Sequence, residues 1–152
     1  SLLPIGHGVA ESMVESGRVD RHPVKRLRTT TAFLVVTLLG TEAERRALRD
    51  EITRVHRRVR SGPDDEVAYD ALDPELQHWV AACLLQGLLD VDARLHGAPA
   101  SGRRLEVLYE HGKRFGSDLQ VRPSTWPADA AAFQRWWDEQ TERIELDDIT
   151  RA

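Results

Sequence analysis

Helix-breaking residues divide this sequence into segments of helical periodicity, and the pattern restricts the chain to an all-α fold. Apolar residues recur three or four positions apart almost throughout, and no run alternates residue by residue as a half-buried strand does. Glycines and prolines stand between these segments, where they begin or end helices. The 152 residues suit one domain, so we predict a single helical bundle over residues 1–152, of about five to seven helices.

Six helices are predicted from this periodicity and from the residues that begin and end it. They cover Leu3–Glu15, Pro23–Leu39, Thr41 to about Arg60, Pro74–His96, Ser101–Phe115 and a segment that begins at Pro127. Thr41 and Glu44 form the pattern of a capping box, and Asp73 precedes Pro74 as an N-cap precedes a first-turn proline. Gly116 is expected to close the fifth helix.

The second predicted helix contains the longest apolar run, "AFLVVTLLG", which ends at Gly40. The run is apolar on nearly every face, which predicts a helix buried among others. It is about half as long as the roughly 20 residues that a membrane-spanning helix needs, so no membrane span is expected. The chain shows no secretory leader, and we expect a cytoplasmic protein. It begins at Ser1 rather than at methionine, so we expect the domain to be truncated at one or both ends.

A histidine stands among four arginines in the stretch "ITRVHRRVRSG", residues 52–62. His56 follows Ile52 by four positions and precedes Val59 by three, so it borders the apolar stripe of its helix. The four arginines lie mostly on other faces of this helix, so they are predicted to be solvated. They are Arg54, Arg57, Arg58 and Arg60. The formal net charge of -4 is opposite in sign to that of a typical nucleic-acid-binding domain, so nucleic acid is not expected as a partner. By position alone, His56 is either a hydrogen-bonded packing residue or a ligand.

Other motifs give little support to alternative chemistries. The Glu-x-x-His spacing of di-iron bundles occurs once, at Glu75 and His78, but that chemistry needs a second copy. Cys83 is the only cysteine, which excludes an intrachain disulfide and a thiolate metal cluster. Arg26 and Thr30 lie four positions apart, on one face of the second predicted helix. Arg26 either extends from the core to solvent or binds a carboxylate.

Several segments, taken in order, resemble the MpaB-type oxygenases and the rubber oxygenases (latex clearing proteins). They are "GHGVAESMVESGRVDRHPVKRLRTT", "LLGTEAE", "VHRRVRSG" and "YDALDPELQHWVAACL". The most specific parts are the Arg26-x-x-x-Thr30 pair, the His56-x-x-Val59 segment before a glycine, and "YDALDPELQHWV". The resemblance extends over residues 3–140.

This resemblance implies a globin-like helical core that holds haem b, with dioxygen as co-substrate and an apolar, isoprenoid-like substrate. His56 matches the family's axial histidine, which makes it the candidate iron ligand. Arg26 and Thr30 match the family's arginine and threonine near the haem, so they are candidates for both cofactor binding and catalysis. A histidine ligand needs a neutral imidazole in a mostly apolar pocket, which suits a residue at the edge of an apolar stripe.

One residue departs from the family pattern. Rubber oxygenases have a lysine immediately before the threonine, whereas this chain has Thr29, which offers no amine to the distal side of the haem. The distal chemistry of this protein is therefore expected to differ from theirs. The alternative to a haem oxygenase is a cofactor-free helical domain of the same fold that binds a ligand or another protein.

Overall fold

The computed structural model describes residues 23–64, 67–142 and 144 of the chain. Within these ranges it contains five α-helices, one short 3-10 helix and no strands, which confirms the all-α prediction. The elements are α2 (Pro23–Leu39), α3 (Glu42–His56), α4 (Pro74–His96), α5 (Gly102–Asp118), the 3-10 helix η2 (Pro123–Thr125) and α6 (Ala130–Thr141). The helix predicted over Leu3–Glu15 lies outside the described residues.

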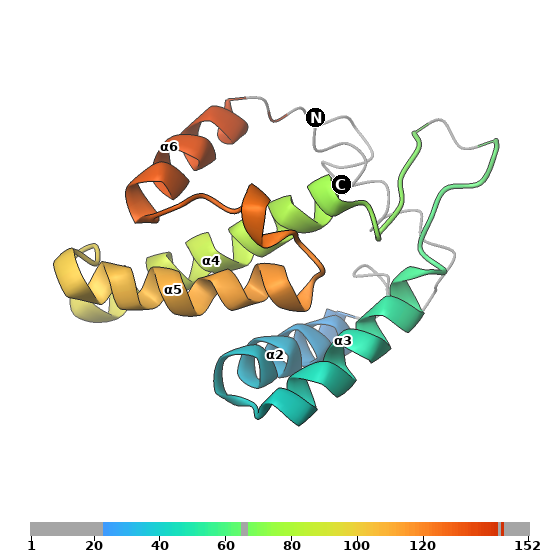
Figure 1. Ribbon diagram of the computed structural model, residues 1–152, viewed down its shortest axis with the longest axis horizontal. Coiled ribbons are helices and arrows are strands. Elements are labelled where there is room, and N and C mark those ends of the chain that lie inside the picture. Colours follow the sequence, from blue (N-terminus) through green and yellow to red (C-terminus); the bar gives the residue numbers. More distant parts are fainter. Residues whose placement is uncertain (1–22, 65–66, 143, 145–152) are drawn as a thin grey trace.

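The helices form three layers (Figure 1). The pair α2 and α3 lies below, the antiparallel pair α4 and α5 crosses the middle, and α6 lies above. Helix α5 contacts each of the other four α-helices, so it is the centre of the packing. The buried apolar cluster comes from several elements and comprises Phe33, Ala81, Ala82, Leu85, Tyr109, Phe115, Leu119, Val121, Trp126 and Phe133.

Two glycines on α5 let neighbouring elements approach it closely. A methyl group at Gly112 would clash with the side chain of Leu85 on α4, and one at Gly116 would lie 3.3 Å from the indole of Trp126. The prediction that Gly116 closes this helix is therefore wrong, because α5 continues to Asp118 and Gly116 is buried inside it. Gly116 provides space for an indole ring rather than a helix end.

The start signals of α2 to α4 and the stop signals of α2 and α4 act as predicted. The bounds Pro23–Leu39 of α2 are confirmed. The capping box is present: the hydroxyl of Thr41 accepts a hydrogen bond from the amide of Glu44, whose carboxylate accepts one from the amide of Thr41 at 2.7 Å. Asp73 caps the first turn of α4, and Gly97 ends that helix in the left-handed conformation, with φ 72°.

Helix α3 is shorter than predicted, because it ends at His56 rather than near Arg60. After a turn, the chain extends along residues 69–71 and forms an isolated β-bridge between Arg60 and Asp70. The amide of Ser61 donates to the carbonyl of Tyr69 at 2.8 Å in the same pairing. Hydrogen bonds to a segment about ten residues away along the chain thus replace the last predicted turn of the helix. Helical periodicity describes only neighbouring residues, so it could not predict this pairing.

Helix α6 begins at Ala130, later than the start predicted at Pro127. The side chain of Asp129 is the N-cap and accepts from the amide of Ala132 at 2.7 Å. Pro127 precedes this cap, and its carbonyl accepts a hydrogen bond from the hydroxyl of Tyr109 on α5. The carbonyl of Pro127 therefore holds the connection to α5, while Asp129 begins the helix.

The prediction that α2 is buried on most faces is wrong. Phe33 and Thr37 are buried, but other apolar residues of the same run are exposed, of which Val35 and Leu39 are 50% and 81% exposed. Helix α2 packs on α3 and α5 from one side, which explains the difference.

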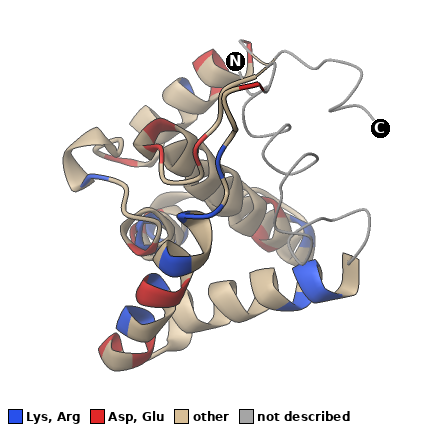
Figure 2. Cartoon of the chain, turned by 90° about the vertical axis from the view of Figure 1, so that its right-hand side faces the viewer, with Lys and Arg blue, Asp and Glu red and all other residues tan. Residues whose placement is uncertain are grey.

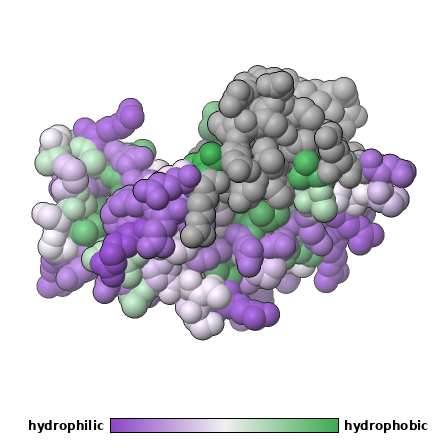
Figure 3. Space-filling model, turned by 90° about the horizontal axis from the view of Figure 1, so that it is seen from above, coloured by the Kyte–Doolittle hydropathy of each residue, from purple (hydrophilic) through white to green (hydrophobic). Residues whose placement is uncertain are grey.

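The molecular face in Figure 3 is mostly hydrophilic with small apolar patches. No described helix is both long and apolar enough to cross a membrane.

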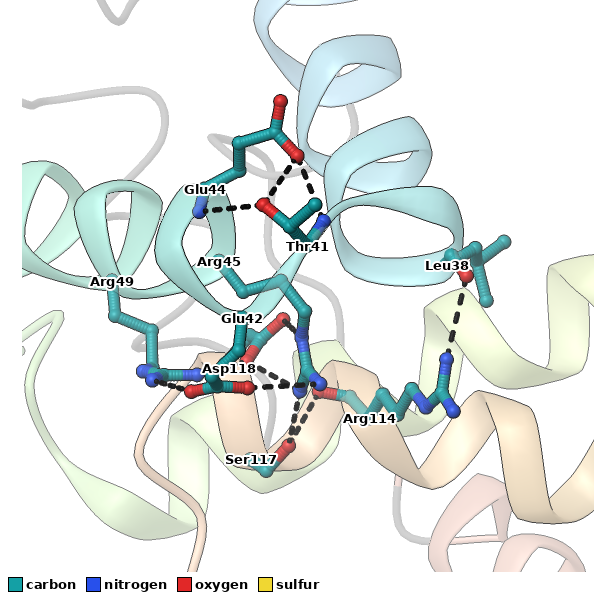
Figure 4. Close-up of polar contacts among 9 residues, drawn as sticks. All are labelled: Leu38, Thr41, Glu42, Glu44, Arg45, Arg49, Arg114, Ser117 and Asp118. Atoms are coloured by element: carbon teal, nitrogen blue, oxygen red, sulfur yellow. Dashed lines mark hydrogen bonds and ion pairs between the residues drawn. The ribbon is translucent and has the colours of Figure 1, made fainter.

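A buried carboxylate joins α3 to α5 (Figure 4). Asp118, at the end of α5, is 0% exposed and accepts two hydrogen bonds from the guanidinium of Arg45, at 2.9 and 3.0 Å. Arg49, one turn later on α3, donates to the same carboxylate at 2.9 Å and pairs with Glu42 at 2.8 Å. Such charge-assisted, bidentate contacts are stronger than neutral hydrogen bonds and fix the relative position of the two helices.

The ionised form of Asp118 stabilises the folded state. Burial is the largest single influence and acts to raise its pKa, but the hydrogen bonds from Arg45 and Arg49 outweigh it and hold the pKa below the usual 3.8. Because the folded-state pKa is the lower one, this stabilisation is fully present above pH 3.8. It is lost as the pH falls through the lowered pKa of the folded state.

Replacing Asp118 by Asn should destabilise the protein at neutral pH by about 3 kcal/mol, because two arginines lose their shared carboxylate. Chemical denaturation would measure this difference in the free energy of unfolding. The difference should shrink when the pH is lowered into the acid range, because the wild-type carboxyl is then protonated. The exposed Asp50 of α3 provides the control: Asp50→Asn should leave the stability nearly unchanged. Equal losses in the two variants would contradict the assigned role of Asp118.

Candidate functional site

His56 occupies the last position of α3, at the edge of the core. Its side chain is half-buried, and its Nδ1 atom is buried without a hydrogen-bond partner among the described residues. Of the neighbouring apolar residues on the same helix, Ile52 packs against the core cluster. The helical spacing therefore predicted the inward position of His56 correctly, and the structure adds that one ring nitrogen remains uncommitted.

The surroundings of His56 favour its neutral form. Burial lowers the pKa of His56 below the usual 6.5, and the positive charge of Arg26 lowers it further. At neutral pH the imidazole is therefore uncharged, which is the form that can donate an electron pair to a metal ion. A half-buried neutral imidazole with an uncommitted nitrogen has the chemistry of a metal ligand.

Arg26 and Thr30 lie on α2, whose N-terminal half contains all the basic residues of that helix (Figure 2). Arg26 is exposed and close enough to His56 for its charge to act on the imidazole, although the two residues are 30 positions apart. Thr30 is half-buried one turn further along α2. No hydrogen bond between described residues joins Thr30 to His56. The structure thus places the charge of Arg26 near enough to act on His56, while Thr30 lies one turn further along α2.

Thr29 stands where rubber oxygenases have a lysine. Its hydroxyl donates a hydrogen bond of 2.9 Å to the carbonyl of Arg26 in the preceding turn of α2, and the residue is exposed. A threonine hydroxyl bound back to its own helix is a common local arrangement. It provides neither a charge nor an amine at this position.

The arginines around His56 are solvated, as predicted. Arg54 pairs with Glu51 on the exposed side of α3, at 2.6 Å, and the three arginines that follow His56 are exposed. The division of this basic stretch into an inward histidine and outward arginines is therefore confirmed. No group of three or more potential metal-ligating side chains occurs among the described residues.

A second feature is a cavity of about 740 Å³ between the start of α4, the η2 segment and α6. Its aromatic lining consists of His78, Trp79 and Trp136. The ring of His78 stacks on Trp136 with centroids 4.7 Å apart, and its buried Nε2 has no hydrogen-bond partner among the described residues. Burial lowers the pKa of His78, so this ring too is neutral at neutral pH.

The cavity was not predicted from the sequence. The adjacent pair of Trp136 and Trp137 was a partial signal, because neighbouring helix positions cannot face the same way. In the structure, Trp137 stacks on Trp79 at 5.0 Å, whereas Trp136 lines the cavity. Trp137 thus packs against α4 and Trp136 forms a wall of the cavity. The sequence does not show which residues of α4 these two rings contact.

The sequence model described as "ER-bound oxygenase mpaB/B'/Rubber oxygenase, catalytic domain" matches residues 3–152. The chain belongs to this family. The match agrees with the resemblance inferred from the segments around Arg26, His56 and residues 69–80. Oxygenase chemistry with dioxygen is thus what membership suggests, while the family match by itself identifies neither a cofactor nor a substrate.

Two similar proteins come from mycobacteria. They are the uncharacterised proteins Mb2261 of Mycobacterium bovis and Rv2237 of Mycobacterium tuberculosis, each 41% identical to this chain over 143 residues. The alignment covers 94% of this chain but only 56% of each relative, so the chain spans about half the length of these proteins. No solved structure matches the chain.

Replacing Arg26 by Gln should raise the pKa of His56, because removing a nearby positive charge makes protonation of the imidazole easier. The pKa should stay below 6.5, since burial remains the larger cause of the shift. Titration of the histidine ring signals by NMR would measure it. Arg28→Gln removes an equal charge from the same helix and should leave the pKa of His56 unchanged. The same response in both variants would show that Arg26 has no special proximity to His56.

Proposed function

We propose that this protein is a haem b-dependent oxygenase that uses dioxygen to oxidise an apolar, isoprenoid-like substrate. The observation that most supports the proposal is the environment of His56: a half-buried imidazole kept neutral by burial and by Arg26, in a chain that belongs to an oxygenase catalytic-domain family. When bound, haem would supply the iron that binds and activates dioxygen, and the protein would supply the site around it.

His56 is the proposed iron ligand. It stands at the end of α3, and its lowered pKa keeps an electron pair available at neutral pH. A globin-like arrangement of the surrounding helices would exclude water from this side of the iron. Loss of the imidazole should therefore remove the attachment of the cofactor rather than the fold.

Arg26 and Thr30 are proposed to act on the pocket from α2. The guanidinium of Arg26 has no carboxylate bound to it among the described residues, so it is free to pair with a haem propionate in a charge-assisted contact. Thr30, one turn further and half-buried, would provide a hydroxyl to a polar group near the distal side. Thr29 cannot replace the family's lysine as a base or an amine ligand, so the distal side would remain open.

Reconstitution with haemin tests the proposal. Wild-type protein should develop a Soret absorption band, and His56→Ala should lose it, because a haem without its axial ligand is held only by weaker contacts. Imidazole added to the His56→Ala protein should restore part of the band, since it can occupy the space left by the side chain. Circular dichroism of each variant would establish that the helices remain folded.

Two other histidines serve as controls for this experiment. His78 is also half-buried and neutral, so His78→Ala tests whether the competing imidazole holds the iron. His96 is exposed, and His96→Ala should bind haemin as the wild type does. If His78→Ala alone lost the band, or if all proteins bound haemin alike, His56 would not be the ligand. Absence of the band in the wild type would remove the haem-oxygenase proposal.

A cofactor-free ligand-binding domain is the second candidate function, and the aromatic cavity supports it. The volume of about 740 Å³ lies within the range of small-molecule sites. Its walls combine the indole rings of Trp79 and Trp136, which can cover the apolar part of a ligand, with charged and polar side chains, among them Glu75, Arg122 and Gln140. On this proposal the same fold binds an isoprenoid-like molecule near α4 and α6, away from His56, and performs no oxidation.

Titration of haem-free protein with farnesol distinguishes this second function. Tryptophan fluorescence should change saturably, because Trp79 and Trp136 line the cavity, and Trp79→Leu should weaken the binding. His56→Ala should bind farnesol as tightly as the wild type does. A fluorescence change that required bound haem would instead favour the oxygenase. No saturable change would show that the cavity does not accept such a molecule.

A further inference from the structure

We propose that Gln77 and Gln120 are positioning residues for His56, because they close a ring of hydrogen bonds around the end of α3. The ring passes from His56 through the segment that follows it to α4, then to the residues after α5, and returns to α3 one turn before His56. This inference rests on the proposed function, since it concerns the orientation of the proposed haem ligand.

The first half of the ring consists of backbone hydrogen bonds. The amide of Val59 donates to the carbonyl of His56 at 2.9 Å, and the carbonyl of Val59 accepts from the amide of Ala71 at 2.9 Å. The neighbouring bridge between Arg60 and Asp70 belongs to the same pairing. The turn after His56 is therefore attached to the segment that leads into α4.

The second half consists of side chains. The amide group of Gln77, whose side chain is buried with 4% exposure, donates to the carbonyl of Ala71 at 2.9 Å and to Oε1 of Gln120 at 3.2 Å. Gln120 in turn donates from Nε2 to the hydroxyl of Thr53 at 2.6 Å, and that hydroxyl donates to the carbonyl of Arg49. Turning either amide group over would set oxygen against oxygen or N–H against N–H along this chain, so each amide has one satisfactory orientation.

The backbone of Gln120 adopts the left-handed conformation. It has a φ of 60° and is the one non-glycine residue with positive φ in the described ranges. The left-handed conformation is unfavourable for a residue with a side chain, and glycine would avoid this cost. At Gln120 the side chain offsets this cost through its hydrogen bonds to two different helices. The position itself is an ordinary helix end, because the amide of Val121 donates to the carbonyl of Gly116 at 2.9 Å across the left-handed residue.

The ring gives a physical reason for the joint presence of two segments that carry the family resemblance. His56 and Val59 belong to "VHRRVRSG", whereas Ala71 and Gln77 belong to "YDALDPELQHWV". The last turn of a helix frays easily, because its carbonyls lack intrahelical partners. An iron ligand at this position needs a fixed backbone from which to project, and these hydrogen bonds hold the turn after His56 from outside the helix without touching the imidazole itself.

Three variants test the ring in the haem-loaded protein. Gln120→Gly removes the side chain while keeping the left-handed backbone, and Thr53→Val removes the hydroxyl with little change in shape. Both should accelerate haem loss to excess apomyoglobin by about tenfold, as expected when a partner that orients a metal ligand is removed. Both should also broaden the EPR signal of the ferric iron. Thr53→Ser keeps the hydroxyl and should behave as the wild type does.

Amide hydrogen exchange of the haem-free proteins separates positioning from general stability. Protection of the Val59 and Ala71 amides should fall in Gln120→Gly and Thr53→Val, while protection in α6 stays unchanged. Gln134→Ala, which removes an exposed glutamine of α6, should alter neither measurement. If exchange changed but haem loss and the EPR signal did not, the ring would be structural and the inference wrong. Unchanged exchange would show that the ring does not hold this segment.

The reconstitution of wild type and His56→Ala keeps this inference separable from the proposed function. Wild-type protein that takes up no haemin removes both the proposed function and the positioning role. Wild-type protein that binds haemin through His56, with Gln120→Gly indistinguishable from it, removes the positioning role alone. Faster haem loss in Gln120→Gly and Thr53→Val, but not in Thr53→Ser, supports both.

Discussion

The buried carboxylate of Asp118 is the interaction on which the rest of the structure depends. An unpaired charge in that position would be prohibitively costly, so the end of α5 must lie against Arg45 and Arg49 of α3. Because α5 contacts every other described α-helix, a fixed distance between α3 and α5 also places the lower layer against the middle layer. The two layers meet through charge as well as through apolar packing.

The same end of α5 reaches the candidate site through one face of α3. Arg45, Arg49 and Thr53 follow one another at intervals of four residues, and residues 118–120 bind all three. His56 lies in the next turn of that helix. The position of the proposed iron ligand therefore depends on polar contacts that begin at Asp118 and continue to Gln120, with Arg26 approaching from α2.

Much of the fold and a part of the candidate site were predictable. The bounds of α2 and α4, the capping box at Thr41 and the inward place of His56 follow from residues within a few positions of one another. The role of Gly116 and the early end of α3 were predicted wrongly. Both depend on distant partners, an indole in one case and residues 69–71 in the other, which periodicity does not include.

The sequence by itself determined the helical class, the helix starts and the solvated state of the arginines, because capping and amphipathic spacing act over one or two helical turns. Only the tertiary structure decided that Arg26 lies near His56, that Gln120 adopts a left-handed backbone to reach Thr53, and that an aromatic cavity opens between α4 and α6. Those features join side chains far apart along the chain, so their geometry exists only once the helices have packed.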